Sequence, residues 1–125
     1  MGKTDELEVL LSNWLAPNVE RLAVTLHRDF VAFGREEGLF VRADAPMFLS
    51  WARRSNLSSG SPSRVDWCDV HGTLATACLV QEIPDSIKTI VLTMLNVSQG
   101  WRVMTATFSV LDAANPPVAG KVHVN

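Results

Sequence analysis

The feature that most constrains the fold is a long β-rich run in the second half of the chain. It extends from Arg64 to Leu111 and is interrupted at 72–73, 84–85 and 98–100 by glycine, proline and small polar residues. Such residues at short intervals are typical of turns between antiparallel strands. The run therefore predicts four strands, near 64–71, 74–82, 87–97 and 101–111.

Short helical segments precede this run. Apolar residues recur at helical spacing over 7–14, again over 19–26 after Asn18, and once more over 47–51 after Asp44. We expect the second helix to end near His27. Between the second and third helices, apolar residues at 30–33 and 39–41 flank the polar, glycine-bounded segment 34–38, which predicts a hairpin.

Helices first and a long sheet afterwards indicate an α+β fold. We expect three N-terminal helices packed on the concave face of a curved, mainly antiparallel β-sheet, in a cone-like arrangement. The 125 residues suit a single domain over 1–125, with a core over about 5–111 and a C-terminal tail over 112–125.

Composition excludes several classes of protein. Hydrophobic residues at 47% and charged residues at 19% exclude a disordered chain, and no apolar run is long enough to span a bilayer. The net charge of −2 and the lack of a basic stripe argue against nucleic-acid binding. The acidic start of the chain lacks the basic residues of a signal peptide, so we expect a cytoplasmic protein with Cys68 and Cys78 reduced. We favour two small buried hydrophobes over a regulatory disulfide between them.

Several local patterns, in order, resemble the nuclear transport factor 2-like superfamily, a cystatin-like α+β cone. The segments that carry the resemblance are Asn18–Leu22 followed by Leu26-His27, then Ala45–Trp51, Val70–Ala77, and Leu92–Leu95 through Gly100–Val103. They are most similar to the lumazine-binding-like and SnoaL-like branch of small bacterial proteins. Gln99-Gly100 shifts the usual turn glycine by one residue, which leaves the register of the last hairpin open.

The resemblance implies a pocket between the helices and the concave face, and frequently a homodimer through the other face. It does not settle function, because the superfamily includes isomerases, dehydratases, hydrolases, oligomerisation modules and transport factors. It also implies that His27 lies near the base of the pocket.

The candidate catalytic groups are His27 and Asp66, either of which could act as a general base in an apolar pocket. Asp66 and Asp69 have opposite parity along one predicted strand, so at most one of them points inward. For each candidate the ordinary structural role is the more common one. No spacing of His, Cys, Asp or Glu suits a metal site, and no motif indicates a cofactor.

The candidate ligand-binding residues are mostly aromatic or sulfur-bearing and come from elements predicted to face one another. They are Trp14, His27, Phe48, Trp51, Trp67, Met94 and Met104. Most must serve as ordinary core, and some are suited to lining a flat apolar cavity for an aromatic ligand. A ligand-sized cavity and a filled core both remain open.

Both faces of the strand predicted over 87–97 are largely apolar. Odd positions carry Ile, Thr, Val and Leu, and even positions carry Lys, Ile, Leu, Met and Asn. Three short helices can cover only one face, so we expect a symmetric homodimer to cover the other. The leading prediction is a dimeric binding protein for a small apolar or flat aromatic ligand, acting on neither nucleic acid nor membrane. The alternatives are a small isomerase- or hydrolase-type enzyme and a structural dimerisation module.

Overall fold

Three helices and six strands make up the fold. The structure is a computed structural model that describes residues 3–15, 18–36, 38–55, 63–83, 86–98 and 100–112. The helices are α1 (Lys3–Leu15), α2 (Val19–Thr25) and α3 (Ala45–Ser55). The strands are β1 (Leu26–Glu36), β2 (Leu39–Asp44), β3 (Ser63–His71), β4 (Leu74–Ile83), β5 (Ser86–Val97) and β6 (Gly100–Asp112). The predicted α+β class is confirmed, and the four strands of the second half begin or end within a residue or two of their predicted bounds.

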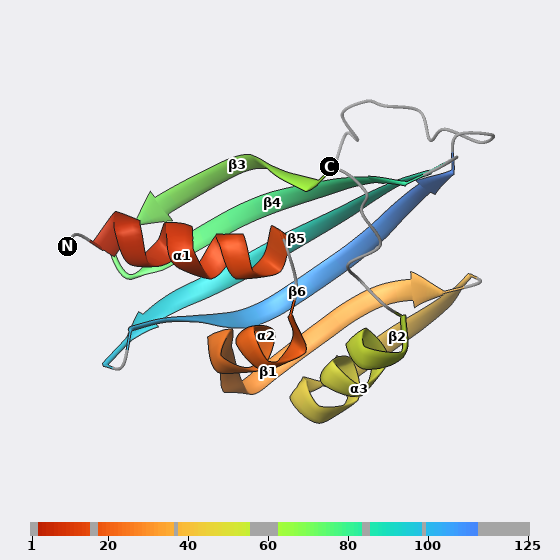
Figure 1. The fold of residues 1–125 in the computed structure, drawn as a ribbon, viewed down its shortest axis with the longest axis horizontal. Helices are drawn as coiled ribbons and strands as arrows, with labels where there is room; N and C mark the ends of the chain where they lie inside the picture. Colours follow the sequence, from red (N-terminus) through yellow and green to blue (C-terminus); the bar gives the residue numbers. More distant parts are fainter. Residues whose placement is uncertain are drawn as a thin grey trace, which may run out of the picture.

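The strands form one sheet in the order β2-β1-β6-β5-β4-β3, which is antiparallel except where β1 runs parallel to β6. Figure 1 shows the three helices lying together over one side of this twisted sheet. We call that side the inner face and the opposite side the outer face. The predicted hairpin is β1–β2, and the parallel pairing places β1 beside residues 103–107 of β6.

The second helix is shorter than the sequence predicts. Asn18 caps its start as expected, with its side-chain oxygen accepting hydrogen bonds from the backbone of Glu20 and Arg21. The helix ends at Thr25, whose hydroxyl donates to the carbonyl of Leu22, and Leu26 is already extended. The helix therefore does not reach His27 as predicted, because the hydroxyl of Thr25 turns back to the helix and Leu26 already pairs with Val103 of β6.

The last hairpin has a settled register. Val97 pairs with Gly100, and Gly100 has a φ of +108°, which glycine adopts without strain. Two bulges and one larger register shift interrupt the sheet. The bulges lie between Val65 and Trp67 in β3 and at Met104 in β6, and the register shift lies between Leu26 and Val31 in β1. A bulge adds one residue to one strand and increases its bend and twist, so the two contribute to the curvature of the sheet.

The core lies between the helices and the inner face. Even-numbered residues of β5 point into it, and Leu92 and Met94 are completely buried there. From the other side, α1 and α2 contribute Leu7, Leu11 and Leu22. Odd-numbered residues of β5 lie on the outer face with Trp67, Cys78 and Val80 of the neighbouring strands.

The two cysteines lie on opposite faces of the sheet. Trp67 pairs with Cys78, whereas Cys68 pairs with Ala77 on the inner face. Cys78 is buried and Cys68 is exposed, and neither forms a disulfide. The expectation of two buried thiols therefore holds only for Cys78; the bulge in β3 places Cys68 on the opposite face of the sheet, where it is exposed. The predicted tail lies, from residue 113 on, outside the described residues.

Candidate functional site

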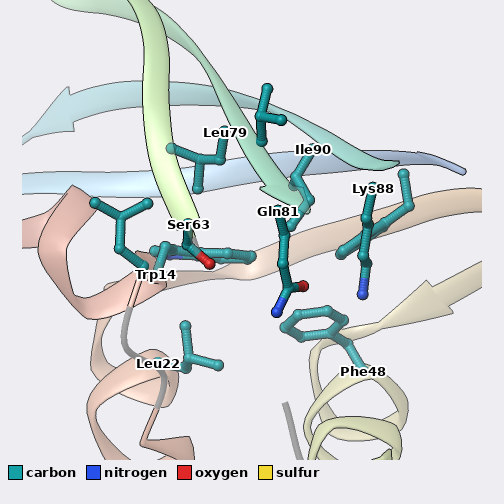
Figure 2. Close-up of a pocket in the computed structure, with 11 residues that line it drawn as sticks. Trp14, Leu22, Phe48, Ser63, Leu79, Gln81, Lys88 and Ile90 are labelled. Atoms are coloured by element: carbon teal, nitrogen blue, oxygen red, sulfur yellow. The ribbon is translucent and has the colours of Figure 1, made fainter. Parts of the chain in front are cut away.

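A cleft opens between the helices and the inner face, toward the end of β4 and the start of β5. Figure 2 shows its lining, which combines apolar and aromatic side chains with three polar ones. The enclosed part has a volume of about 30 Å³, and the whole indentation with its solvent-filled mouth takes up about 470 Å³. The interior therefore has room for one or two water molecules rather than for a buried ligand. The lining residues are Trp14, Leu15, Leu22, Phe48, Ser63, Leu79, Val80, Gln81, Lys88, Ile90 and Phe108.

Helix caps and a buried hydrogen bond position the helical side of the cleft. Asp44 accepts a hydrogen bond from the backbone N–H of Met47, which fixes the start of α3 and so the place of Phe48. On α1, the indole Nε1 of Trp14 donates to the hydroxyl of Thr25 at 3.1 Å, in a buried contact that ties α1 to α2. The apolar body of Trp14 is thereby held at the cleft wall.

Phe48 is the centre of a cluster of aromatic rings. Its ring stacks on that of Trp14, with centroids 5.6 Å apart and an interplanar angle of 23°. The rings of Phe30, Trp51 and Phe108 lie between 5.2 and 6.1 Å from it. Aromatic pairs at these separations are attractive beyond the area that they bury, so the cluster gives the cleft a firm apolar wall.

The sheet side of the cleft is organised in two rows that run across neighbouring strands. Ser63 pairs with Gln81, and Gln81 pairs with Lys88, so these side chains share one face and form what we call the polar row. The next row inward joins Leu79, Ile90 and Phe108, which we call the apolar row. The cleft is therefore amphipathic, with hydrogen-bond donors along one edge and hydrocarbon beside it.

Lys88 is the one charged residue among the described residues that line the cleft. Its ammonium lies 4.8 Å from the ring centroid of Trp51 and 5.1 Å from that of Phe108, in cation–π contact with both. Burial lowers the pKa of Lys88 below its usual value, because the charged form loses water in the cleft. In the described part of the chain no carboxylate forms an ion pair with it.

The predicted ligand-binding residues are only partly brought together. Trp14 and Phe48 line the cleft, and Trp51 contacts Phe48, Phe108 and Lys88 just behind it. The other three sulfur-bearing or aromatic candidates lie elsewhere. Met94 is buried in the core, Met104 is the bulge residue of β6, and Trp67 lies on the outer face with 42% of its surface exposed.

The candidate general bases are not among the residues that line the cleft. His27 lies in β1, where its Nδ1 accepts a hydrogen bond from the backbone of Asp29. Asp66 is exposed at the bulge of β3, and Asp69 is exposed farther along that strand. The bulge at Asp66 breaks the simple alternation of side chains on which the comparison of Asp66 with Asp69 depended.

The charge of Asp66 acts on a nearby thiol. Burial raises the pKa of the Cys78 thiol, and the charge of Asp66 adds to this rise.

The sequence interpretation missed Lys88, Gln81 and Phe108. A signal for Lys88 was present, since it shares the parity of the core residues Ile90, Leu92 and Met94. A lysine on the buried side of a strand is unusual and indicates either a paired charge or a functional group. Gln81 and Phe108 can be recognised as cleft residues only once the strand pairing is known.

Two further observations concern ions and membranes. Across the ranges described above, His, Cys, Asp and Glu side chains do not gather in groups of three that could hold a metal ion. Within those ranges, none of the helices is long and apolar enough to cross a membrane.

Similar solved structures share the fold at low sequence identity. An NTF-2-like protein of unknown function from Silicibacter pomeroyi superposes with a TM-score of 0.76 at 14% identity, over 88% of this chain and 99% of that one. An NTF2-like protein of unknown function from Methylobacillus flagellatus gives 0.71 at 18% identity, over 86% and 88% of the two chains. A de novo designed protein with a curved β-sheet gives 0.61 at 14% identity, over 87% and 99%.

The curated proteins contain no match to this sequence. Residues 7–109, however, match the model of a family described as "Putative lumazine-binding". This match covers most of the chain and shows that the chain belongs to that family, and its helix-covered six-stranded sheet has the same fold as the NTF2-like proteins above.

Proposed function

We propose that this protein binds a small, flat, apolar ligand in the cleft and that it acts as a homodimer joined through the outer face of its sheet. The observation that carries the first part is the meeting of three aromatic rings from different elements at a solvent-open indentation. These rings belong to Trp14 of α1, Phe48 of α3 and Phe108 of β6.

The chemistry of the cleft favours a planar ligand. Aromatic faces stack on flat rings, and apolar clefts with a few polar groups at one edge are typical of small-molecule sites. Because the enclosed part holds only about 30 Å³, a bound ring would occupy the open part of the indentation, against the half-buried side chains of Ile90 and Phe108. The family description names lumazine, a flat bicyclic heterocycle, and this supports the same ligand class.

Thermal unfolding in the presence of lumazine and other flat heteroaromatic compounds tests this function. We expect a concentration-dependent rise in Tm for the native chain. In Phe108→Leu, which removes one ring of the cleft, the rise should shrink. Phe40→Leu is the matched control, because Phe40 is 68% exposed on β2 and lies outside the cleft lining. If no flat heteroaromatic compound raises Tm, or if both variants lose the rise equally, ligand binding in this cleft is refuted.

Catalysis by an isomerase- or hydrolase-type mechanism has less support. A general base must lie within hydrogen-bond reach of the substrate proton or one water away from it. His27 and Asp66 do not line the cleft, and the Nδ1 of His27 already accepts a hydrogen bond. Binding is therefore the function that we propose.

The outer face supports the homodimer. Trp67, Leu74 and Ile87 expose between 40% and 42% of their surface there, and partly buried Val91 and Leu95 lie between them. Soluble monomers seldom expose an apolar patch of this kind. The outer faces of two copies can cover each other by packing sheet against sheet. Light scattering at micromolar concentration should give the mass of two chains, and the mass of one would contradict the dimer. A dimer without any ligand response would favour a structural dimerisation module instead.

We also propose a cytoplasmic location. Cys68 and Cys78 form no disulfide, and unpaired cysteines are usual in a reducing compartment.

A further inference from the structure

The position of Lys88 is costly for a protein that needs only a stable fold. Lys88 is half-buried, so its ammonium loses part of its water among aromatic rings, and its attraction to the faces of Trp51 and Phe108 offsets only part of the lost hydration. The two cross-strand neighbours of Lys88 are Gln81 and Val110, and neither carries a charge. The site therefore holds a cation that lacks an anion among the described residues.

The neighbours of Lys88 in the polar row are also hydrogen-bond donors. The amide group of Gln81 and the hydroxyl of Ser63 stand on the two adjacent strands, at the spacing of about 5 Å that separates paired strands. Figure 2 shows the polar ends of Gln81 and Lys88 pointing to the same side, toward Phe48. A cation and an amide that point to the same side of an apolar wall offer two hydrogen-bond donors to one anionic group.

The number of charges selects the kind of anion. One ammonium balances one negative charge, and a phosphate ester at neutral pH carries close to two. Arginine, which grips phosphate through two parallel hydrogen bonds, does not occur among the described residues that line the cleft. Arg64 follows Ser63 of the polar row in the sequence, but it lies on the outer face. There its guanidinium forms an ion pair with the carboxylate of Glu82, with an N–O distance of 3.0 Å. A carboxylate fits this arrangement.

We propose, building on the ligand-binding function above, that the cleft recognises an aromatic carboxylate. The carboxylate binds the polar row, with Lys88 as its counter-ion, and the ring lies against Ile90 and Phe108 of the apolar row. Because strand pairing sets the two rows side by side, a ligand whose carboxylate is attached directly to its ring reaches both at once.

Two probes of the same shape test this assignment. Naphthalene-2-carboxylate and naphthalene-2-carboxamide differ by one charge, and isothermal titration at pH 7 measures both affinities. A charge-assisted hydrogen bond in a partly desolvated site should favour the carboxylate by about tenfold or more. In Lys88→Met the affinity for the carboxamide should remain and the preference for the carboxylate should disappear.

Arg64→Met is the matched control, since it removes one positive charge from the outer face and leaves the cleft unchanged. It should keep the preference of the native chain. If both probes bind the native chain within about threefold of each other, or if Lys88→Met keeps the preference, carboxylate recognition is overturned while the ligand-binding function stands. If neither probe binds and flat neutral heterocycles also fail to raise Tm, the ligand-binding function falls as well.

Discussion

The hydrogen bond between Trp14 and Thr25 links the cleft wall to the stability of the fold. Thr25 is 5% exposed, and its hydroxyl accepts from the Nε1 of Trp14 at 3.1 Å while it donates to the Leu22 carbonyl at 2.7 Å. In Thr25→Val the side chain keeps its shape but loses both hydrogen bonds. The buried N–H of Trp14 then has no acceptor at this position, which should cost about 1–3 kcal/mol of the free energy of unfolding.

Urea unfolding followed by far-ultraviolet circular dichroism measures this cost, at one fixed protein concentration because a dimer would make stability depend on concentration. For a chain of this length each 1 kcal/mol corresponds to roughly 3–5 °C in Tm. The loosened indole should also weaken the binding of flat ligands, since Trp14 lines the cleft.

A double-mutant cycle with Trp14→Phe supplies the control. The phenyl ring has no N–H to leave unsatisfied, so Thr25→Val should cost about 1 kcal/mol less in that background. If Thr25→Val is as stable as the native chain, or if its cost is the same in both backgrounds, the buried hydrogen bond does not position Trp14.

Four further changes have definite expected outcomes. Lys88→Met should raise the free energy of unfolding at pH 7, because burial lowers the pKa of Lys88 in the folded state and so disfavours its charged form. This advantage should shrink as pH rises from the folded pKa toward about 10.4, where the unfolded chain also gives up its proton; an advantage that stays constant from pH 7 to 10.5 in urea unfolding would exclude this cause. Gly72→Ala should cost about 1 kcal/mol in the same assay, because Gly72 has a φ of +63°, which alanine adopts only with strain. The added Cβ meets no atom within 4 Å, so the cost comes from the backbone alone, and an unchanged stability would mean that the turn had rearranged. Asn18→Ala should also cost about 1 kcal/mol by loss of the α2 cap, and a smaller loss in Asn18→Asp would confirm the capping role. Val91→Glu should convert the dimer into a monomer in light scattering while circular dichroism stays native, and a persistent dimer would place the interface elsewhere.

Local sequence signals predicted the hairpins well, because short-range turn chemistry decides them. Gly72 and Gly100 both adopt positive φ, and each lies at a predicted turn. Alternation along β5 identified two apolar faces, and the structure assigns Ile90, Leu92 and Met94 to the helix-covered one. Where neighbouring residues along the chain determine the conformation, the sequence was sufficient to predict turns and strand faces.

The errors arose where distant strands decide the conformation. The apolar spacing up to Leu26 favours a longer α2, but Leu26 pairs with Val103 of β6 and the chain is extended from there on. The bulge between Val65 and Trp67 turns Trp67 outward, and it leaves no mark in the local pattern of residue types. The residues of the cleft were the hardest to predict, because its polar row combines side chains from three strands whose pairing the local sequence does not reveal.

The irregularity in β3 also bears on how copies of this chain can meet. β3 is one margin of the sheet, and the extra residue there interrupts the even succession of N–H and C=O groups that an incoming strand would need. The opposite margin is β2, which has only six residues. With a bulge at one border and a short strand at the other, lateral growth into an extended ribbon is disfavoured, which agrees with the face-to-face dimer that we propose.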